Sequence, residues 1–358
     1  MSKSTELDFL PKIGITCGDI NGIGLEVIIK TFADNRMLQN CIPVIYCNAK
    51  AAVQYRKSIH LTDFGFHQIK NVNDATNKNV NLLNVYDKEV KLEFGVSSSQ
   101  AGELALASIN AAIADLKAGL IDMIVTAPIN KDNIQSPEFK FAGHTEYFAQ
   151  QFDAKEHLMF LISDNLKVGT VTGHIPISQV AANLTVEKIV SKAKLMVSSL
   201  QKDFGIRKPR IAILGLNPHA GDNGVIGDEE KNIIIPAIEK LKEHGLLAFG
   251  PFGADGFFGS GIFTKYDAAL SMYHDQGLIP FKTLAFENGV NYTAGLPIVR
   301  TSPDHGTAYD LAGKNIASES SFRYAVYHAI DILANRKLES EINSNPLKIS
   351  LQKRERDR

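Results

Sequence analysis

Cysteine, tryptophan and long apolar runs are scarce in this chain. Its 358 residues include three cysteines and no tryptophan. Cys17, Cys41 and Cys47 have neither the paired spacing of a zinc site nor the even number of a disulfide framework, so we expect reduced thiols, as in a cytoplasm. No stretch of about 18 apolar residues can span a bilayer, and the first residues, MSKSTELDFLPK, lack the apolar core of a signal peptide. We therefore expect a cytoplasmic protein with no membrane partner.

An excess of charge is also absent. Thirty-eight basic residues stand against 39 acidic ones, a net charge of −1, which argues against nucleic-acid and membrane-surface partners. The 44% hydrophobic and 22% charged content is that of an ordinary globular protein. This length predicts two domains or lobes rather than one.

Apolar runs typical of buried strands alternate with amphipathic helical patterns. This alternation predicts an α/β fold with a mostly parallel sheet covered by helices on both faces. The polar, Asn-rich residues 60–96 predict a variable edge region, and we expect the charged tail, 344–358, to be frayed. The predicted strands lie at 12–17, 42–48, 121–131 (running into a loop), 168–174, 211–219, 268–275 and 287–300, and the helices at 25–38, 102–120, 185–202, 228–244 and 318–333.

A glycine-rich run, GDINGIG (18–24), joins the first predicted strand to the first helix. Its glycines permit a tight turn, but the run lacks the GxGxxG order of a dinucleotide-binding loop, so we disfavour that interpretation. The segment FAGHTEYFAQQF (141–152) predicts a loop followed by a helix, with Thr145 as N-cap.

Three histidines, His174, His219 and His274, share one context, because each closes a predicted strand. Ligands bind outside the carboxyl ends of strands in open α/β sheets. A metal ion bound by three imidazoles keeps a coordination position open for water or substrate, and this arrangement is typical of catalytic metal sites. Any one of them can equally satisfy a backbone carbonyl in a loop, but the repeated context favours the metal site.

Two carboxylates, Asp255 and Asp275, are the candidates to assist these histidines. Each can orient an imidazole, bind a metal directly or act as a general base. Asp255 precedes Gly256 and can equally be a turn residue. In the stretch 271–282 we expect a strand that ends at His274 and Asp275 and a turn at Gly277.

Polar residues in both halves of the chain can bind an anion. Lys282, Asn291 and Arg300 can hold a phosphate or carboxylate by charge-assisted hydrogen bonds, although surface exposure is the usual fate of a lysine or arginine. His144 and Thr145, at the start of a predicted helix, add donors where a helix N-terminus favours anions. The loop TSPDHGTAYDLAGK can wrap an adenosine or phosphate group, or be only a long connection.

Eight segments together resemble the family of 4-hydroxythreonine-4-phosphate dehydrogenase, an enzyme of pyridoxal phosphate biosynthesis. They occur in the family's order and span residues 12 to about 330. One departure is visible: the family's GDPAGIGPE has prolines where Ile20 and Leu25 stand here, so we expect a less rigid loop. The segments are GDINGIGLE, IVTAPINK, GHTEYFA, VTGHIP, LNPHAGDNG, GPFGADGFF, YHDQGLIPFK and TSPDHGTAYDLAG.

This resemblance implies the fold of the isocitrate and isopropylmalate dehydrogenase group, with two α/β/α lobes around a central cleft. Residues 1–135 and 285–358 would form the lobe on the cofactor side. Residues 136–284 would form the lobe with the metal site and the dimer interface. The resemblance further implies a homodimer with active sites at the interface, so the metal ligands need not all come from one chain.

The family's functional residues carry over by motif. The resemblance implies NAD or NADP as cofactor and one divalent ion (zinc, magnesium, cobalt or manganese) in each site. The metal ligands would be His174, His219 and His274; the substrate contacts His144, Thr145, Lys282, Asn291 and Arg300; and the cofactor contacts His305, Gly306 and Asp310.

The activity that the resemblance implies is oxidation of 4-phosphooxy-L-threonine, followed by decarboxylation. A dehydrogenase for another phosphorylated hydroxy acid and a phosphoacyl transferase on the same fold are alternatives. A third alternative is a non-catalytic protein that binds a phosphorylated metabolite. The three histidines capable of binding a metal argue against it, because binding a phosphate needs no open metal site.

Overall fold

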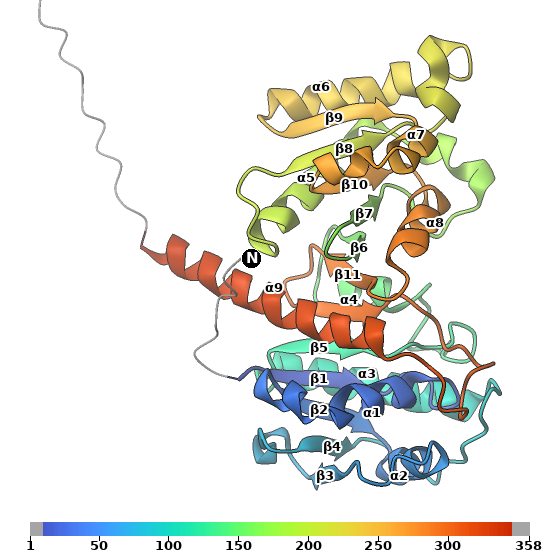
Figure 1. Cartoon of the computed structure of the whole chain (residues 1–358), viewed down its shortest axis with the longest axis vertical. Helices are drawn as coiled ribbons and strands as arrows, with labels where there is room; N and C mark the ends of the chain where they lie inside the picture. Colours follow the sequence, from blue (N-terminus) through green and yellow to red (C-terminus); the bar gives the residue numbers. More distant parts are fainter. Residues whose placement is uncertain (1–9, 346–358) are drawn as a thin grey trace, which may run out of the picture.

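The computed structural model describes residues 10–345, and its strands form one sheet of twelve (Figure 1). The strand order is β3-β4-β2-β1-β5-β12-β11-β6-β7-β10-β8-β9. The strands are β1 Lys12–Thr16, β2 Ile42–Cys47, β3 Phe66–Ile69, β4 Val80–Asn84, β5 Met123–Thr126, β6 Leu158–Ile162, β7 Lys167–Thr170, β8 Arg210–Leu214, β9 Leu247–Phe252, β10 Ala268–Ser271, β11 Val290–Ala294 and β12 Arg300–Pro303.

Most neighbouring strands run parallel, as the alternation of strands and helices predicts. The exceptions lie at the centre of the sheet, where β6 is antiparallel to both β7 and β11, and β11 is antiparallel to β12. The predicted α/β fold with a mostly parallel sheet is therefore confirmed. Five strands were not predicted: β3 and β4 in the edge region 60–96, β6, β9, and β12, which occupies the start of the stretch predicted as a loop.

Helices connect the strands and cover the sheet (Figure 1). The long helix α9 packs on β5, β11 and β12, while α3 packs on β1, β2 and β5. The α-helices are α1 Gly24–Ala33, α2 Ala49–Ser58, α3 Ser99–Lys117, α4 His144–Gln151, α5 Val186–Lys202, α6 Ile235–Glu243, α7 Ala254–Gly259, α8 His274–Ala285 and α9 Ser320–Ser344. Short 3-10 helices include η1 Asn35–Gln39, η3 Ile177–Gln179 and η5 Pro218–Gly224, and η6 Glu230–Ile234 is a π-helix.

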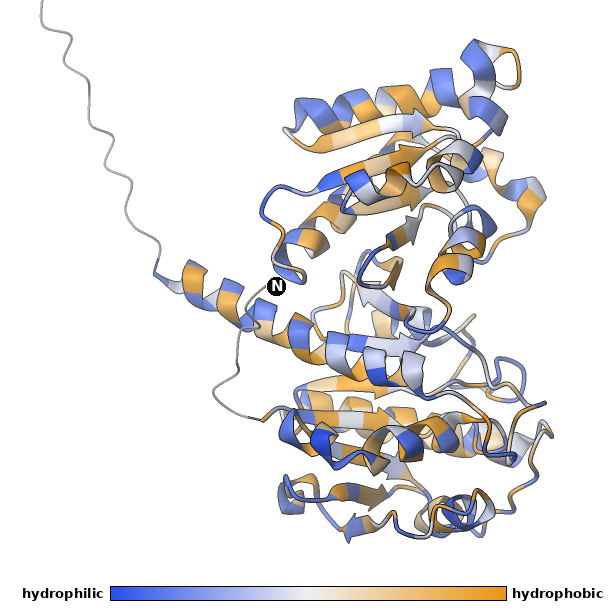
Figure 2. Ribbon diagram, viewed as in Figure 1, coloured by the Kyte–Doolittle hydropathy of each residue, from blue (hydrophilic) through white to orange (hydrophobic). Residues whose placement is uncertain are grey.

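The core lies on both faces of the sheet because successive strand side chains point to opposite sides. In β2, Ile45 and Cys47 join the apolar cluster that contains α1 and α9, whereas Val44 and Tyr46 join the cluster that contains α3. Figure 2 shows the consequence: the strands are largely hydrophobic, and helices such as α6 carry hydrophilic residues as well.

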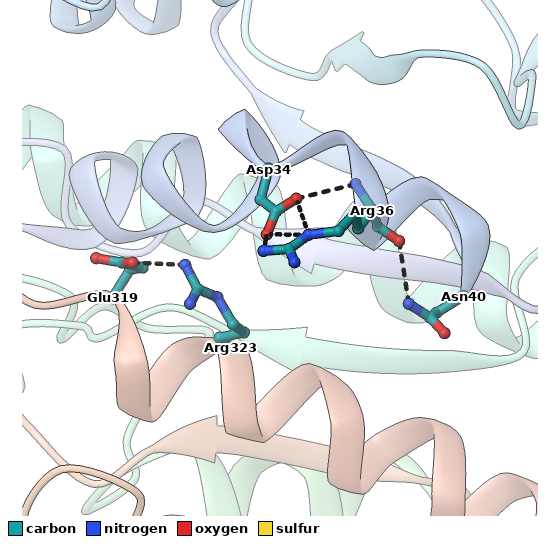
Figure 3. A network of polar contacts seen from close by, with 5 residues as sticks. All are labelled: Asp34, Arg36, Asn40, Glu319 and Arg323. Carbon is teal, nitrogen blue, oxygen red and sulfur yellow. Dashed lines mark hydrogen bonds and ion pairs between the residues drawn. The ribbon is translucent and has the colours of Figure 1, made fainter.

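A capped turn closes the connection from α1 to β2. The carboxylate of Asp34 accepts hydrogen bonds from Nε and Nη2 of Arg36, at 2.9 and 2.6 Å, and from its backbone N–H at 3.0 Å (Figure 3). Asn40 then donates to the Arg36 carbonyl. Nearby on α9, Arg323 pairs with Glu319, and Arg323 also helps to lower the pKa of Asp34. The hydrogen bonds from Arg36 are the main cause of that pKa, which is about 2.

Several predicted element boundaries were wrong. Thr145 is not an N-cap: Gly143 holds that position and Thr145 lies in the first turn of α4. Gly277 does not form a turn but lies inside α8, where it lets the helix approach Ser271 and Val168. The last helix extends from residue 320 to 344, well past the predicted end at 333.

The predicted lobe boundaries, after residues 135 and 284, stay a prediction, since one sheet continues across both parts of the chain. Between residues 10 and 345, no helix has the length and apolar character needed to cross a membrane. Of the tail that we expected to be frayed, residues 346–358 lie outside the described part of the chain.

Candidate active site

A cavity of about 280 Å³ opens where β5, β12 and several loops meet. It is bounded by the loop after β5, the start of α4, the side chains of β6, the first turns of α8 and the loop after β12. Its lining includes the predicted residues His144, Thr145, His174, His274, Lys282, Asn291, Arg300, His305 and Gly306. Residues far apart in the sequence thus converge here.

Arg300 is the most deeply buried charge of this cavity, with 2% of its surface exposed. Its guanidinium donates to the hydroxyls of Thr126, at 2.6 and 3.2 Å, and Thr293, at 3.2 Å, and lies 5.8 Å from the ring centre of Phe148. Burial lowers its pKa to about 9, so the side chain remains charged at neutral pH. The charge of Glu146 opposes this shift, but within residues 10–345 no carboxylate forms an ion pair with Arg300. A buried cation without a direct ion pair is unfavourable unless a ligand supplies the opposite charge.

Lys282 provides a second cation, held by the loop after β12. Its Nζ lies 3.1 Å from Oδ1 of Asp304 and donates to the Asp304 carbonyl at 2.9 Å. Burial raises the pKa of Asp304, and the lysine opposes that shift. The pair therefore fixes the lysine at the cavity wall and leaves one of its three N–H donors for a ligand.

Four buried polar atoms of the cavity wall have no hydrogen-bond partner. Buried polar groups are nearly always paired, so these atoms indicate a missing polar ligand or water. Burial, with help from Arg300, lowers the pKa of His144 well below its usual value, and burial also lowers that of His305. Both imidazoles are thus neutral at neutral pH. The unpartnered atoms are His144 Nε2, Glu146 Oε2, Asn291 Oδ1 and His305 Nε2.

His174 and His274 face each other at the cavity, with ring centres 5.6 Å apart. Nδ1 of His274 lies 2.7 Å from Oδ1 of Asp275, and Nδ1 of His174 lies 3.5 Å from Oε1 of Glu146. The hydrogen bond from His174 lowers the pKa of Glu146. A carboxylate beside one ring nitrogen leaves the other nitrogen free for a metal ion.

His219 and Asp255 form a separate group. His219 lies on the exposed turn η5 after β8. Asp255 lies in the first turn of α7, so the alternative interpretation of Asp255 as a turn residue was wrong. An added Cβ on Gly253 would lie 3.5 Å from the His219 Cα and 3.3 Å from Asp255 Oδ1, which places both residues beside Gly253. Neither lines the cavity, and among residues 10–345 no three His, Cys, Asp or Glu side chains converge to hold a metal.

The glycine-rich run 18–24 packs against the loop after β12. Ile23 donates its backbone N–H to the Thr307 carbonyl at 2.9 Å, and a side chain on Gly22 would collide with that carbonyl. The Tyr309 hydroxyl donates to the fully buried Asp19 carboxylate at 2.7 Å. These contacts hold His305 and Gly306 at the cavity, while Asp310 is exposed and lies outside its lining.

Three charged residues that line the cavity were not predicted: Lys131, Glu146 and Asp304. The only sequence signal was their presence inside the segments IVTAPINK, GHTEYFA and TSPDHGTAYDLAG. Their importance depends on tertiary neighbours. Glu146 matters because it faces His174, and Asp304 because it pairs with Lys282.

Comparison with known proteins agrees with the resemblance. The family model of the pyridoxal phosphate biosynthetic protein PdxA matches residues 39–329. The 4-hydroxythreonine-4-phosphate dehydrogenase of Bacteroides thetaiotaomicron is 51% identical over 338 residues, which cover 94% of this chain and 93% of that protein. The enzyme of the same name from a Sulfurihydrogenibium species is 43% identical, covering 91% and 99%.

A solved structure shows the same relationship. The crystal structure of 4-hydroxythreonine-4-phosphate dehydrogenase from Klebsiella pneumoniae superposes with a TM-score of 0.79 at 33% identity. The match covers 92% of this chain and all of that one. The chain therefore belongs to the family of the pyridoxal phosphate biosynthetic protein PdxA and is an oxidoreductase.

Proposed function

We propose that this protein oxidises 4-phosphooxy-L-threonine with NAD+ or NADP+ in the biosynthesis of pyridoxine 5′-phosphate. The first product is 2-amino-3-oxo-4-phosphooxybutanoate, a β-keto acid that loses CO2 to give 3-amino-2-oxopropyl phosphate. The observation that supports this most strongly is the buried Arg300 guanidinium, which lines the cavity and forms no ion pair with any described residue. The names of the relatives support the choice of substrate.

The cavity has the charge that a phosphorylated amino acid requires. Arg300, Lys282 and Lys131 contribute three cations, and α4 directs its N-terminal N–H groups toward the same space. Glu146 is the carboxylate whose buried Oε2 has no partner, so it suits the substrate ammonium. We propose that the cations bind the phosphate and carboxylate and so fix the C3 hydroxyl in one position.

The residues at the cavity fit a divalent ion if a third imidazole joins them. His174 and His274 each have a carboxylate beside Nδ1 and lie close enough to share one ion. We propose that these two bind it together with His219 of the partner subunit. A bound divalent ion would lower the pKa of the substrate hydroxyl and stabilise negative charge on its oxygen. Zinc, magnesium, cobalt and manganese all accept such a site.

The loop after β12 fits the nicotinamide cofactor. The unpartnered Nε2 of the buried His305 requires a polar ligand atom, and the neighbouring Gly306 has open space where a side chain would stand. NAD+ or NADP+ bound here would accept the hydride from C3. Asp310 lies on the same loop, outside the cavity lining, and we propose it for the more distant part of the cofactor.

Removal of the hydroxyl proton requires a base, for which Asp255 and Asp275 are the candidates. Asp275 is exposed and contacts the lining residue His274, although it does not itself line the cavity. Asp255 lies beside His219 and would reach a cavity only in the partner subunit. When the β-keto acid forms, its carboxylate leaves as CO2 and the electron pair passes to the adjacent carbonyl.

A homodimer would complete the site. Exposed apolar side chains follow each of the three histidines: Ile177 is 71% exposed, Val225 81% and Ile279 64%. Large apolar side chains exposed near polar functional groups are typical of an interface. Mixing inactive H219A and H274A dimers tests this proposal, because each heterodimer would contain one intact site. Recovery of about a quarter of wild-type activity is expected, and no recovery would contradict the shared site.

The function itself is tested by incubating the pure protein with 4-phosphooxy-L-threonine, NAD+ or NADP+, and a divalent ion, with and without a chelator. Reduced nicotinamide should form only when the metal is present. The unphosphorylated 4-hydroxy-L-threonine is the control and should react far more slowly. If no reduced nicotinamide forms with any of the metals, the proposal fails.

A further inference from the structure

The turn that carries His219 has an unusual backbone. Five consecutive residues, His219–Asn223, have positive φ angles of 53, 52, 79, 43 and 56°. Only Gly221 among them lacks the Cβ that makes this conformation unfavourable. A run of strained residues persists only where the surroundings hold it, and such strain is concentrated at functional sites.

The His219 side chain itself is exposed and forms no hydrogen bond with any described residue. Its direction is therefore set by its backbone rather than by a side-chain partner. Whatever holds the left-handed turn also determines where the imidazole points.

Glu230 is the group that holds this turn. It begins the π-helix η6 and is only 3% exposed. Its Oε1 accepts the backbone N–H groups of Leu216 and Asn217, both at 2.7 Å, and its Oε2 accepts the Asn217 side-chain amide at 2.9 Å. Within residues 10–345 no cation forms an ion pair with it, so these N–H donors alone stabilise its charge.

The same carboxylate occupies the inside of the loop. A Cβ on Gly221 would lie 2.6 Å from Oε2 of Glu230, and a Cβ on Gly215 would lie 3.0 Å from Oε1. The loop is closed around it by hydrogen bonds from Ala220 N to the Asn217 carbonyl and from Ile226 N to the Gly221 carbonyl, both at 3.1 Å. Glu230 thus contacts both sides of the turn that His219 begins.

We propose that Glu230 is a positioning residue for His219, which it presents to a divalent ion shared with the partner subunit. This inference rests on the proposed function, in which His219 is a metal ligand. Glu230 does not touch the ion or the substrate. It acts by keeping residues 219–223 in the left-handed conformation in the absence of the ligand, so that binding the ion requires no reordering of the loop.

The adjacent Glu229 provides a matched control. It also accepts a hydrogen bond from the Asn217 side chain, at 2.7 Å, but it accepts none from the backbone N–H groups of residues 215–217. Glu230→Gln replaces one acceptor oxygen by a donor that cannot accept the backbone N–H groups. Glu229→Gln changes the charge by the same amount one residue away.

The test is a titration of the full-length protein with cobalt(II), followed by the visible absorption of the bound ion. E230Q should bind cobalt about 10- to 100-fold more weakly than wild type, with an altered spectrum. E229Q should keep the wild-type affinity and spectrum, and E230D, which keeps the charge, should lie between wild type and E230Q. Thermal unfolding and circular dichroism identify any variant that fails to fold. If E230Q fails to fold, the cobalt affinity and spectrum of E230D test the inference instead.

His219→Ala separates this inference from the proposed function. If H219A binds cobalt as wild type does, His219 is not a ligand and the proposed metal site fails whatever Glu230 does. If H219A loses affinity while E230Q and E230D both keep the wild-type affinity and spectrum, Glu230 does not position His219 and the inference is overturned.

Discussion

Arg300 donates two hydrogen bonds, of 3.2 and 2.6 Å, to the hydroxyl oxygen of Thr126. A neutral hydroxyl orients the guanidinium but does not neutralise it. The fixed cation is therefore available to an anionic ligand, and substrate binding and protein stability should respond to its loss in opposite ways.

Replacement of Arg300 by methionine should reduce kcat/KM for the phosphorylated substrate by at least about 30-fold, because a buried charge pair contributes about 2–5 kcal/mol. The free energy of unfolding, measured in urea, should stay unchanged or increase, since an unpaired buried charge is removed. R210M, at an exposed arginine, is the control for activity. Loss of stability in R300M with kcat/KM retained would assign Arg300 a structural role.

Replacement of Lys282 by methionine should decrease both activity and stability. The substrate loses a phosphate donor, and Asp304, with 13% of its side chain exposed, loses its counter-ion. We expect kcat/KM to fall about 10- to 100-fold and the free energy of unfolding to fall by about 1–3 kcal/mol. The double variant K282M/D304N should regain stability but not activity. K88M, in the exposed pair with Glu103, should change neither quantity.

Acidification should destabilise the protein in part through His328 on α9. Burial lowers its pKa from 6.5 to about 4. Between these two values the unfolded chain binds a proton that the folded chain does not, so stability is present above pH 6.5 and falls as the pH drops toward 4. The loss is at most about 3 kcal/mol.

Urea unfolding at several pH values measures this contribution. H328Q should show a shallower decrease of stability than wild type across that window. H67Q, at an exposed position of the edge strand β3, should keep the wild-type slope. Parallel curves for H328Q and wild type would show that the buried imidazole does not contribute.

Replacement of Gly277 by alanine should reduce the free energy of unfolding by about 1–3 kcal/mol. The new Cβ would lie 2.5 Å from Ser271 Oγ and 2.7 Å from Val168 Cγ1, so α8 would have to move away from the sheet. Because α8 begins at His274 and carries Lys282, KM should rise as well. G259A, at the end of α7 with open space around it, should change stability by less than about 0.5 kcal/mol.

The sequence pattern predicted six strands of the parallel part of the sheet, β1, β2, β5, β7, β8 and β10, because a buried run followed by an amphipathic helix indicates a strand and its crossover. It did not predict β3, β4 or β12, which also pair in parallel. It missed β6. This strand is antiparallel to β7 and β11, and antiparallel strands can be joined without a crossover helix, so the alternation of strand and helix does not indicate it. It also missed β9, which contains Gly250 and Pro251, residues that are depleted in strands.

The candidate site was predicted unevenly for similar reasons. Histidines and basic residues next to predicted strand ends carry a local signal, and the fold brings most of them to the cavity. Glu146 and Asp304 carry none, because each matters only through a tertiary partner. The left-handed turn at His219–Asn223 was also beyond prediction, since four of its five residues disfavour that conformation and the stabilising Glu230 lies outside the turn.

The most direct test of the proposed reaction is its stoichiometry. Wild-type protein with a divalent ion, NAD+ and a limiting amount of 4-phosphooxy-L-threonine should produce one reduced nicotinamide and one CO2 for each substrate consumed. Mass spectrometry should identify 3-amino-2-oxopropyl phosphate. Consumption of the substrate without reduced nicotinamide, or no consumption at all, would contradict the account.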